Sequence, residues 1–161
     1  MSAQALLMIS RNDILAVAEG ANAKELFRLL AWLTRHRFHL LTTAPMPDHS
    51  DSRERWLKGG GDASLVGPES IRSRIDEAGG TLDGVYYVPR SLLTQKRNRL
   101  NSLRDMMQRY AASSDESYLF SSSRKWAEAA LELDIRATCL DESSQLIGEL
   151  GRLKDKAGAS P

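Results

Sequence analysis

Cysteine is almost absent from this sequence. Cys139 is the only one among 161 residues, so no disulfide can form within the chain and nothing points to an oxidising compartment. No apolar run approaches the roughly 18 residues that suggest a membrane span, and no basic segment precedes the apolar stretch near the N-terminus. We therefore expect a cytoplasmic protein without a membrane partner.

An excess of charge of either sign is missing as well. The chain has 22 basic and 21 acidic residues, which gives a formal net charge of +1. No overall field draws it toward nucleic acid, so a nucleic-acid partner is not expected. With 42% hydrophobic and 27% charged residues, the composition is that of an ordinary globular protein. The length has room for one domain, which we place at 1–155, followed by a polar C-terminal tail at 156–161.

Short apolar runs alternate with helical patterns along the chain. The apolar runs predict strands at 5–10, 38–44, 83–89, 117–122 and 135–140. The helical patterns predict helices at 23–37, 71–78, 97–112, 124–133 and 143–153. This alternation predicts an α/β protein with a doubly wound, Rossmann-like, five-stranded parallel sheet that carries helices on both faces. The longest connection, 45–66, includes a short predicted helix at 51–57 and leaves no room for a large cap.

We expect the residues that follow the strands to form any ligand site, because ligands of open parallel sheets bind beyond the carboxyl ends of the strands. Three stretches at these ends carry a family resemblance: "LLMISRNDIL", "LLTTA" and "SSSRKWAEAA". Together with "IDEAGGTLDGVYYVP", they are similar to motifs of the haloacid dehalogenase (HAD) superfamily of phosphohydrolases. Along most of its length the chain most resembles the small histidinol-phosphate and heptose-bisphosphate phosphatases of that superfamily.

The resemblance implies a degenerate catalytic site. Ser10 and Asn12 stand where the family has its nucleophilic and acid/base aspartates, and Ser122 and Trp126 stand where it has two metal-binding aspartates. Family members attack phosphorus with a carboxylate and hold Mg²⁺ with that carboxylate and the other acids. Hydroxyls and an indole are poor or impossible Mg²⁺ ligands, and the stretch "VPRSLLTQKRNRL" has no cysteine or histidine for a zinc loop. We therefore expect neither metal nor cofactor.

No replacement base is evident beside Ser10. Asp13, where the family has glycine, is interpreted as a capping residue of a helix or loop. His36 and His39 flank a predicted helix-to-strand junction and are interpreted as surface residues. His49, in the loop after the second strand, is the histidine that could approach the site.

Three residues could still hold an anion. The resemblance puts Thr42 at the phosphate-binding hydroxyl position and Lys96 at the phosphate-binding lysine position, and Thr43 adjoins Thr42. A phosphate group could therefore bind without turnover. A turn threonine and a solvated lysine are the alternative interpretation, and the sequence leaves both open.

These observations favour a catalytically inactive, HAD-like pseudo-phosphatase that acts as a binding, regulatory or scaffolding partner of another protein. Trp56, in the long connection, is the candidate for the partner surface, because tryptophan is enriched at interface hot spots. Two alternatives stay open: a phosphatase of the superfamily with an altered site, and a non-catalytic sensor of a phosphorylated small molecule. The oligomeric state is open too.

Overall fold

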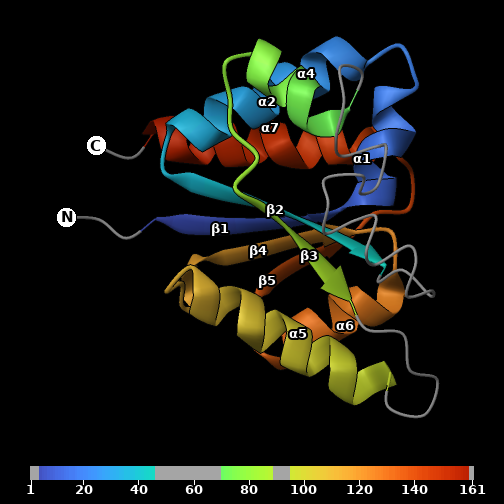
Figure 1. Cartoon of the computed structure of the whole chain (residues 1–161), viewed down its shortest axis with the longest axis vertical. Helices are drawn as coiled ribbons and strands as arrows, with labels where there is room; N and C mark the ends of the chain where they lie inside the picture. The colour runs from blue at the N-terminus through green and yellow to red at the C-terminus, as the bar shows by residue number, and fades with distance from the viewer. Residues whose placement is uncertain (1–3, 46–69, 89–94, 160–161) are drawn as a thin grey trace, which may run out of the picture.

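A parallel sheet is the centre of the computed structural model, which describes residues 4–45, 70–88 and 95–159. Its five strands lie in the order β3-β2-β1-β4-β5, and every neighbouring pair is parallel. The predicted doubly wound, Rossmann-like α/β fold is therefore confirmed (Figure 1). The strands are β1 (Ala5–Ser10), β2 (Phe38–Pro45), β3 (Gly84–Val88), β4 (Ser117–Ser121) and β5 (Arg136–Cys139).

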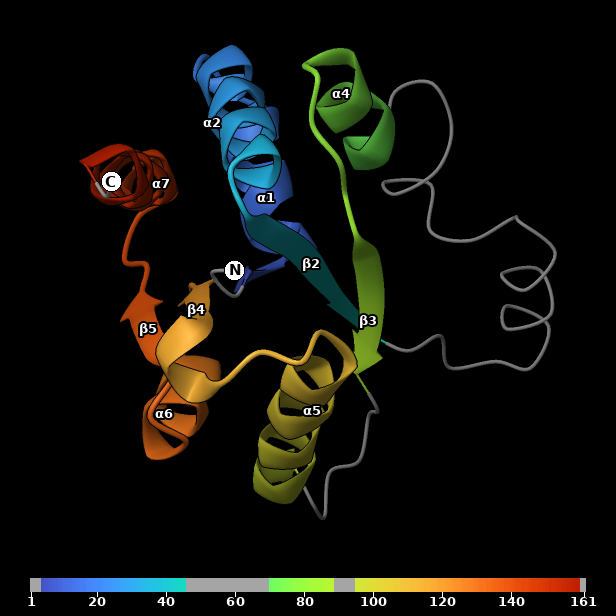
Figure 2. The same cartoon turned by 90° about the vertical axis from the view of Figure 1, so that its left-hand side faces the viewer.

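Helices cover both faces of this sheet. Figure 2 shows α1, α2, α4 and α7 on one face and α5 and α6 on the other. A single turn of 3-10 helix, η2, precedes β4. The bounds are α1 (Arg11–Ala18), α2 (Ala23–Arg35), α4 (Ile71–Glu77), α5 (Gln95–Arg109), η2 (Ser114–Glu116), α6 (Arg124–Glu132) and α7 (Ser144–Ala159).

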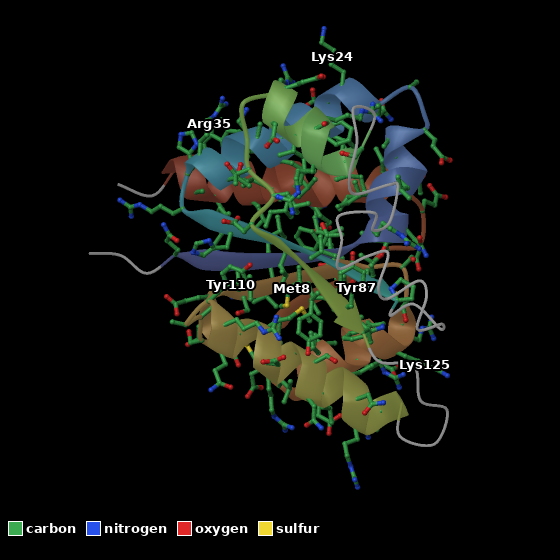
Figure 3. The ribbon with its side chains drawn as sticks, in the orientation of Figure 1. Met8, Lys24, Arg35, Tyr87, Tyr110 and Lys125 are labelled. Carbon is green, nitrogen blue, oxygen red and sulfur yellow. The ribbon has the colours of Figure 1, made fainter. Side chains whose placement is uncertain are left out.

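The central strand β1 shows why the sheet needs a helical layer on each side. Its side chains alternate between the faces, so Leu7 and Ile9 enter the core beneath α1, α2, α4 and α7. Leu6 and Met8 enter the second core beneath α5 and α6, and Figure 3 shows Met8 on that side. All four side chains are fully buried. Burying each contributes about 1.5–3 kcal/mol, which explains the uninterrupted apolar run.

Serine hydroxyls begin three of the helices. Ser10, Ser70 and Ser123 each accept a hydrogen bond from the backbone N–H three residues later, at the starts of α1, α4 and α6. Such a cap typically stabilises a helix by about 1 kcal/mol. Ser10 is the last residue of β1, and Ser123 lies two residues after the end of β4. The caps thus fix the turns at the carboxyl ends of two adjacent strands.

A glycine pair, Gly79 and Gly80, follows the end of α4. Gly79 has φ = 91°, and its N–H donates to the Asp76 carbonyl, while the N–H of Gly80 donates to the Ile75 carbonyl. This pattern is a Schellman cap, which favours glycine at the left-handed position. Gly80 also lies against α2, because a Cβ there would be 2.5 Å from the Cα of Ala31.

Some predictions differ from the structure. Helix α1 was not predicted, because it begins directly after β1 and is only 8 residues long. Helix α7 continues to Ala159, beyond the predicted end at 153, because the amphipathic pattern continues with Ala157 packed against the core. The short helix predicted at 51–57 lies outside the described residues.

Among the described helices, none has the length and apolarity that crossing a membrane requires.

Candidate functional site

A pocket of about 320 Å³ opens at the carboxyl ends of β1, β2, β3 and β4. Strand β1 lies between β2 and β4, and the chain leaves β1 into α1 on one face and β4 into α6 on the other. The pocket is thus at the topological switch point, where ligands of open α/β sheets bind. We call it the switch-point pocket. Its polar lining is Ser10, Arg11, Asn12, Thr43, Ser121, Ser122 and Ser123, and its apolar lining is Ala44, Pro45, Val88, Leu119 and Trp126.

The four positions that the sequence analysis singled out as degenerate come together here. Ser10 ends β1 and Asn12 comes two residues later, while Ser122 and Trp126 follow β4, more than a hundred residues later in the chain. All four line the switch-point pocket. The reason is topological, since adjacent parallel strands bring their carboxyl ends to one edge of the sheet.

Asp13 organises the base of the pocket. The Ser10 hydroxyl donates to Asp13 Oδ2 at 2.7 Å, and the backbone N–H of Ser122 donates to the same oxygen at 3.0 Å. The Asp13 side chain is buried, with 8% of the residue exposed. Charge-assisted hydrogen bonds of this kind are about twice as strong as neutral ones. Asp13 therefore joins the turn after β1 to the turn after β4.

Two expectations bear on this contact. Ser10 is the residue that caps α1, because its Oγ accepts from the Asp13 N–H at 3.2 Å, whereas the Asp13 carboxylate accepts from the Ser122 N–H in the turn after β4. The sequence also offered no base beside Ser10, whereas the folded chain brings the Asp13 carboxylate within hydrogen-bonding distance. The spacing of three residues across a helix start was the available signal.

Of the two candidate threonines, Thr43 lines the pocket and Thr42 does not. Thr42 is fully buried, does not line the pocket, and its Oγ1 has no hydrogen-bond partner among the residues described. Thr43 lines the pocket and is paired in register with Ser10. The physical reason is the alternation of β2, because Leu40 and Ala44 on either side of Thr42 belong to the core beneath α1 and α2.

The cation at the pocket is Arg11 rather than Lys96. The Lys96 side chain is 72% exposed, lies 3.7 Å from the Glu132 carboxylate, and does not line the pocket. Arg11 does line it, and its guanidinium donates to the Asn12 Oδ1 at 3.3 and 3.2 Å. The sequence analysis missed Arg11, although its place directly after β1 was a usable signal.

The serines at and just after the end of β4 accept hydrogen bonds from backbone N–H groups of the turn that follows. Ser121 Oγ accepts from the Ser123 N–H at 3.0 Å, and Ser123 Oγ accepts from the Trp126 N–H at 3.4 Å. The Ser122 side chain is exposed at the pocket. The half-buried Trp126 packs against the α5 and α6 core and forms part of the pocket wall. Hydroxyls and an aromatic ring thus face the same space.

Mg²⁺, which the HAD resemblance implies, does not fit these residues. The four positions present two hydroxyls, an amide whose oxygen is bonded to a guanidinium, and an indole. The carboxylate of Asp13, which bonds to the pocket residue Ser10, is buried and accepts two hydrogen bonds. Mg²⁺ needs at least one accessible carboxylate, and the neighbouring Arg11 repels a cation. Over the described ranges, no three His, Cys, Asp or Glu residues are grouped so as to hold a metal.

The remaining candidates from the sequence lie elsewhere. His36 stacks on Trp32 at 3.8 Å between ring centroids, and His39 contacts Asp83 at 3.2 Å; neither histidine lines the pocket. His49 and Trp56 fall outside the described residues.

No family model matches this chain, and no curated protein matches it either. Among solved structures, it is similar to the crystal structure of an uncharacterized protein from Corynebacterium glutamicum. The TM-score is 0.57 at 13% sequence identity, over 95% of this chain and 96% of that one. At this identity the similarity concerns the fold alone, so what it supports is the Rossmann-like α/β class.

Proposed function

We propose that this chain is a non-catalytic, HAD-like protein whose switch-point pocket binds the phosphate group of a small ligand without hydrolysing it. Such a pseudo-phosphatase acts as a regulatory or scaffolding partner, with the bound ligand as its signal. The proposal depends above all on one observation. Asp13, which accepts from the pocket residue Ser10, is committed to holding two turns together, and the polar lining itself is hydroxyls, an amide and a guanidinium.

The electrostatics of the lining favour an anion. Arg11 and Asn12 belong to the first turn of α1, and Ser123 caps α6, so the pocket borders two helix N-termini. Each N-terminus carries roughly half a positive charge, which favours phosphate. The Arg11 guanidinium adds a full charge, and the hydroxyls of Thr43 and Ser122 can donate to phosphate oxygens.

The apolar lining of the pocket indicates what the ligand carries besides its phosphate group. Pro45, Val88, Leu119 and Trp126 form an apolar wall on the side of β3 and α6. A pocket that joins a few polar groups to an apolar wall is typical of small-molecule sites. We therefore expect a phosphate monoester with a ring that packs against Trp126, such as a sugar phosphate or a nucleotide.

The same residues explain why turnover is not expected. Attack on phosphorus requires an activated nucleophile, and departure of the leaving group is helped by a general acid. Asn12 cannot exchange a proton near neutral pH, and its oxygen is bonded to Arg11. Without a general acid, a factor of about 10²–10⁴ in rate is lost.

Thermal unfolding in the presence of ligand tests the proposal. A hexose phosphate, a nucleoside monophosphate and inorganic phosphate are added separately; a ligand at about 100 times its Kd raises the free energy of unfolding by about 2.7 kcal/mol. Arg11→Gln is expected to remove the stabilisation. Lys96→Gln is the matched control, because Lys96 does not line the pocket, and it should retain the effect. Equal loss in both variants, or no stabilisation by any of the three ligands, contradicts the proposal.

One contact favours a second candidate function, a hydrolase with an altered site. The Ser10 hydroxyl lines the pocket and donates to the Asp13 carboxylate at 2.7 Å. It could therefore act as a nucleophile, with the carboxylate accepting its proton. Release of a phenolate from an aryl phosphate, lost in both Ser10→Ala and Asp13→Asn folded variants, would establish this function. We favour binding, because Asp13 is already shared with the Ser122 N–H.

A further inference from the structure

A second groove, of about 310 Å³, runs along the outer edge of the sheet at β5. It shares no lining residue with the switch-point pocket. Figure 2 shows β5 as the last strand of the sheet, with α7 on one side of it and α6 on the other. The groove reaches from the α7 face of the sheet around the β5 edge to α6, and its lining is Tyr118 and Phe120 of β4, Arg136, Ala137 and Thr138 of β5, Leu131 of α6, and Glu149, Arg152, Leu153 and Lys156 of α7. We call it the β5 groove.

The outer edge of β5 presents backbone groups for pairing. The Leu140 N–H donates to the Ser121 carbonyl of β4 at 2.8 Å. Because successive residues of a strand point their backbone groups to opposite sides, those of Ala137 and Cys139 point away from β4. In the described part of the chain, β4 is the strand that pairs with β5, and none pairs with this outer edge. An edge of this kind is a template for an added strand.

The rim of the β5 groove on the α7 side is basic. Arg152 and Lys156 lie one turn apart on α7, and Arg136 projects from β5 with its guanidinium 5.6 Å from the Tyr118 ring centroid. Against these three cations the groove has one carboxylate, Glu149, which pairs with Arg152 at 3.2 Å. The Arg152 side chain is 80% exposed even so. Arg136 donates to the neutral Tyr118 hydroxyl at 3.4 Å, so that contact leaves its positive charge uncancelled at this basic rim.

The α6 side of the groove is apolar. Leu131 is 57% exposed, and it is the large hydrophobic side chain that the described residues leave most open to solvent. It belongs to α6, which covers the opposite face of the sheet from α7. A strand added to β5 would alternate its side chains between a basic face and an apolar face.

We propose that the β5 groove binds an extended acidic segment of a partner protein, which adds a strand to the sheet. The backbone of the segment pairs with Ala137 and Cys139, its acidic side chains meet Arg152 and Lys156, and its alternate apolar side chains cover Leu131. Backbone hydrogen bonds supply affinity and the alternating pockets supply specificity in this mode of recognition. The inference is independent of the phosphate-binding function, because the two sites share no residue.

Charge argues against a second copy of this chain as the occupant. Antiparallel pairing of two β5 edges about a twofold axis keeps the faces of the sheet aligned and sets the two α7 helices on the same side. Arg152 and Lys156 of both copies would then face one another. Like charges so placed are unfavourable, whereas an acidic segment neutralises them.

A designed peptide tests the proposal with the full chain. The probe is a dye-labelled ten-residue peptide of alternating glutamate and valine, and the comparison peptide replaces each glutamate by lysine. Binding is followed by fluorescence anisotropy, and amide NMR locates it. We expect the acidic peptide to bind, to perturb β5 and the amides of α7, and to weaken as salt is added. The basic peptide should not bind.

Two kinds of variant distinguish strand pairing at the β5 groove from non-specific electrostatic binding of the peptide. Ala137→Pro removes an N–H that points away from β4, a substitution that edge strands tolerate, so the fold is kept while pairing is blocked. The double variant Arg152→Glu with Lys156→Glu should weaken binding by at least about tenfold. Lys24→Glu reverses one charge on α2, far from β5 (Figure 3), where the double variant reverses two, and it should leave binding within about twofold of the unsubstituted chain.

Three results would overturn the proposal. Binding that survives both Ala137→Pro and the double charge reversal places the peptide elsewhere. Equal binding of the basic peptide shows that charge complementarity is not the basis. Concentration-dependent dimerisation that Ala137→Pro abolishes, without binding of the acidic peptide, assigns the edge to a second copy instead.

Discussion

The carboxylate of Asp13 accepts a hydrogen bond at 3.0 Å from the backbone N–H of Ser122, which lies 109 residues later in the chain. Through this bond and the one from Ser10, a single acid fixes the relative position of the two turns that form the pocket. The HAD resemblance puts a glycine at position 13 and acids at positions 10 and 122. Here the acid sits at the glycine position and serves as a structural link.

Replacing Asp13 tests that link. Asp13→Ala removes the acceptor of two hydrogen bonds and leaves the Ser122 N–H without its partner, so we expect the free energy of unfolding to fall by about 2–3 kcal/mol. The midpoint of urea unfolding measures the change. Asn12→Ala is the matched control, since Asn12 is exposed and should cost less than about 0.5 kcal/mol. An unchanged midpoint for Asp13→Ala would show that the link carries no stability.

The two adjacent threonines of β2 should respond in opposite ways. Thr42→Val replaces a fully buried hydroxyl that has no partner among the described residues, so it should raise the free energy of unfolding by about 1 kcal/mol and leave ligand binding intact. Thr43→Val removes a hydroxyl from the pocket and should weaken phosphate binding about tenfold with little effect on stability. Calorimetric titration and thermal unfolding of both variants check the pair. Weaker binding in Thr42→Val alone would reverse our assignment.

Gly80 should not tolerate a side chain. A Cβ there would lie 2.5 Å from the Ala31 Cα and 2.8 Å from the Thr34 Oγ1, so α4 and α2 would have to separate. We expect Gly80→Ala to lower the free energy of unfolding by about 1–3 kcal/mol. Gly148→Ala is the contrasting control, because nothing lies within 4 Å of a Cβ at that position of α7 and alanine favours a helix by about 0.5–1 kcal/mol. Equal stabilities of the two variants would contradict the close approach.

Glu116, in the turn that precedes β4, makes the free energy of unfolding depend on pH. Its Oε1 accepts from the Ser113 N–H at 3.0 Å and from the Ser113 hydroxyl at 2.8 Å. These hydrogen bonds, the backbone one first, lower the pKa of the Glu116 carboxyl below its ordinary value of 4.5. A depressed pKa means that the carboxylate stabilises the fold above about pH 4.5 and that this contribution is lost as pH falls through the lower, folded-state pKa.

The corresponding variant is Glu116→Gln. It should be less stable than the unsubstituted chain at about pH 7, and the difference should disappear by about pH 3. Chemical unfolding at the two pH values provides the measurement. Asp115→Asn, at the exposed neighbouring position, should show no comparable change with pH. A Glu116→Gln difference that is the same at both pH values would rule out the carboxylate as its source.

Much of the fold could be predicted from the sequence, because burial on both faces leaves a plain pattern. The run that contains Leu6 to Ile9 indicates a covered strand, and the alternation with helical segments indicates parallel pairing. Helix α1 could not be predicted in the same way. It follows β1 without a loop, and it buries a short stretch that includes the β-branched Ile14 and Val17.

The site was only partly predictable. Ser10 and Ser122 line one pocket because adjacent parallel strands end at one edge of the sheet, and the sequence analysis already placed both residues at strand ends. Whether Thr42 or Thr43 lines the pocket depends on which face of the sheet each side chain points to, and this follows from the strand register. The contact between Asp13 and Ser122 depends on tertiary structure. The β5 groove was not predictable at all, because it requires knowing which strand lies at the edge of the sheet.

Phosphorus NMR of a hexose phosphate and a nucleoside monophosphate, each incubated with the protein and Mg²⁺, tests the central claim most directly. It observes binding and hydrolysis in one experiment. Our account predicts that the phosphate resonance of at least one ligand shifts or broadens, that Arg11→Gln abolishes this change, and that no inorganic phosphate forms. Steady release of inorganic phosphate that Ser10→Ala eliminates, or resonances that the protein leaves unchanged, would contradict it.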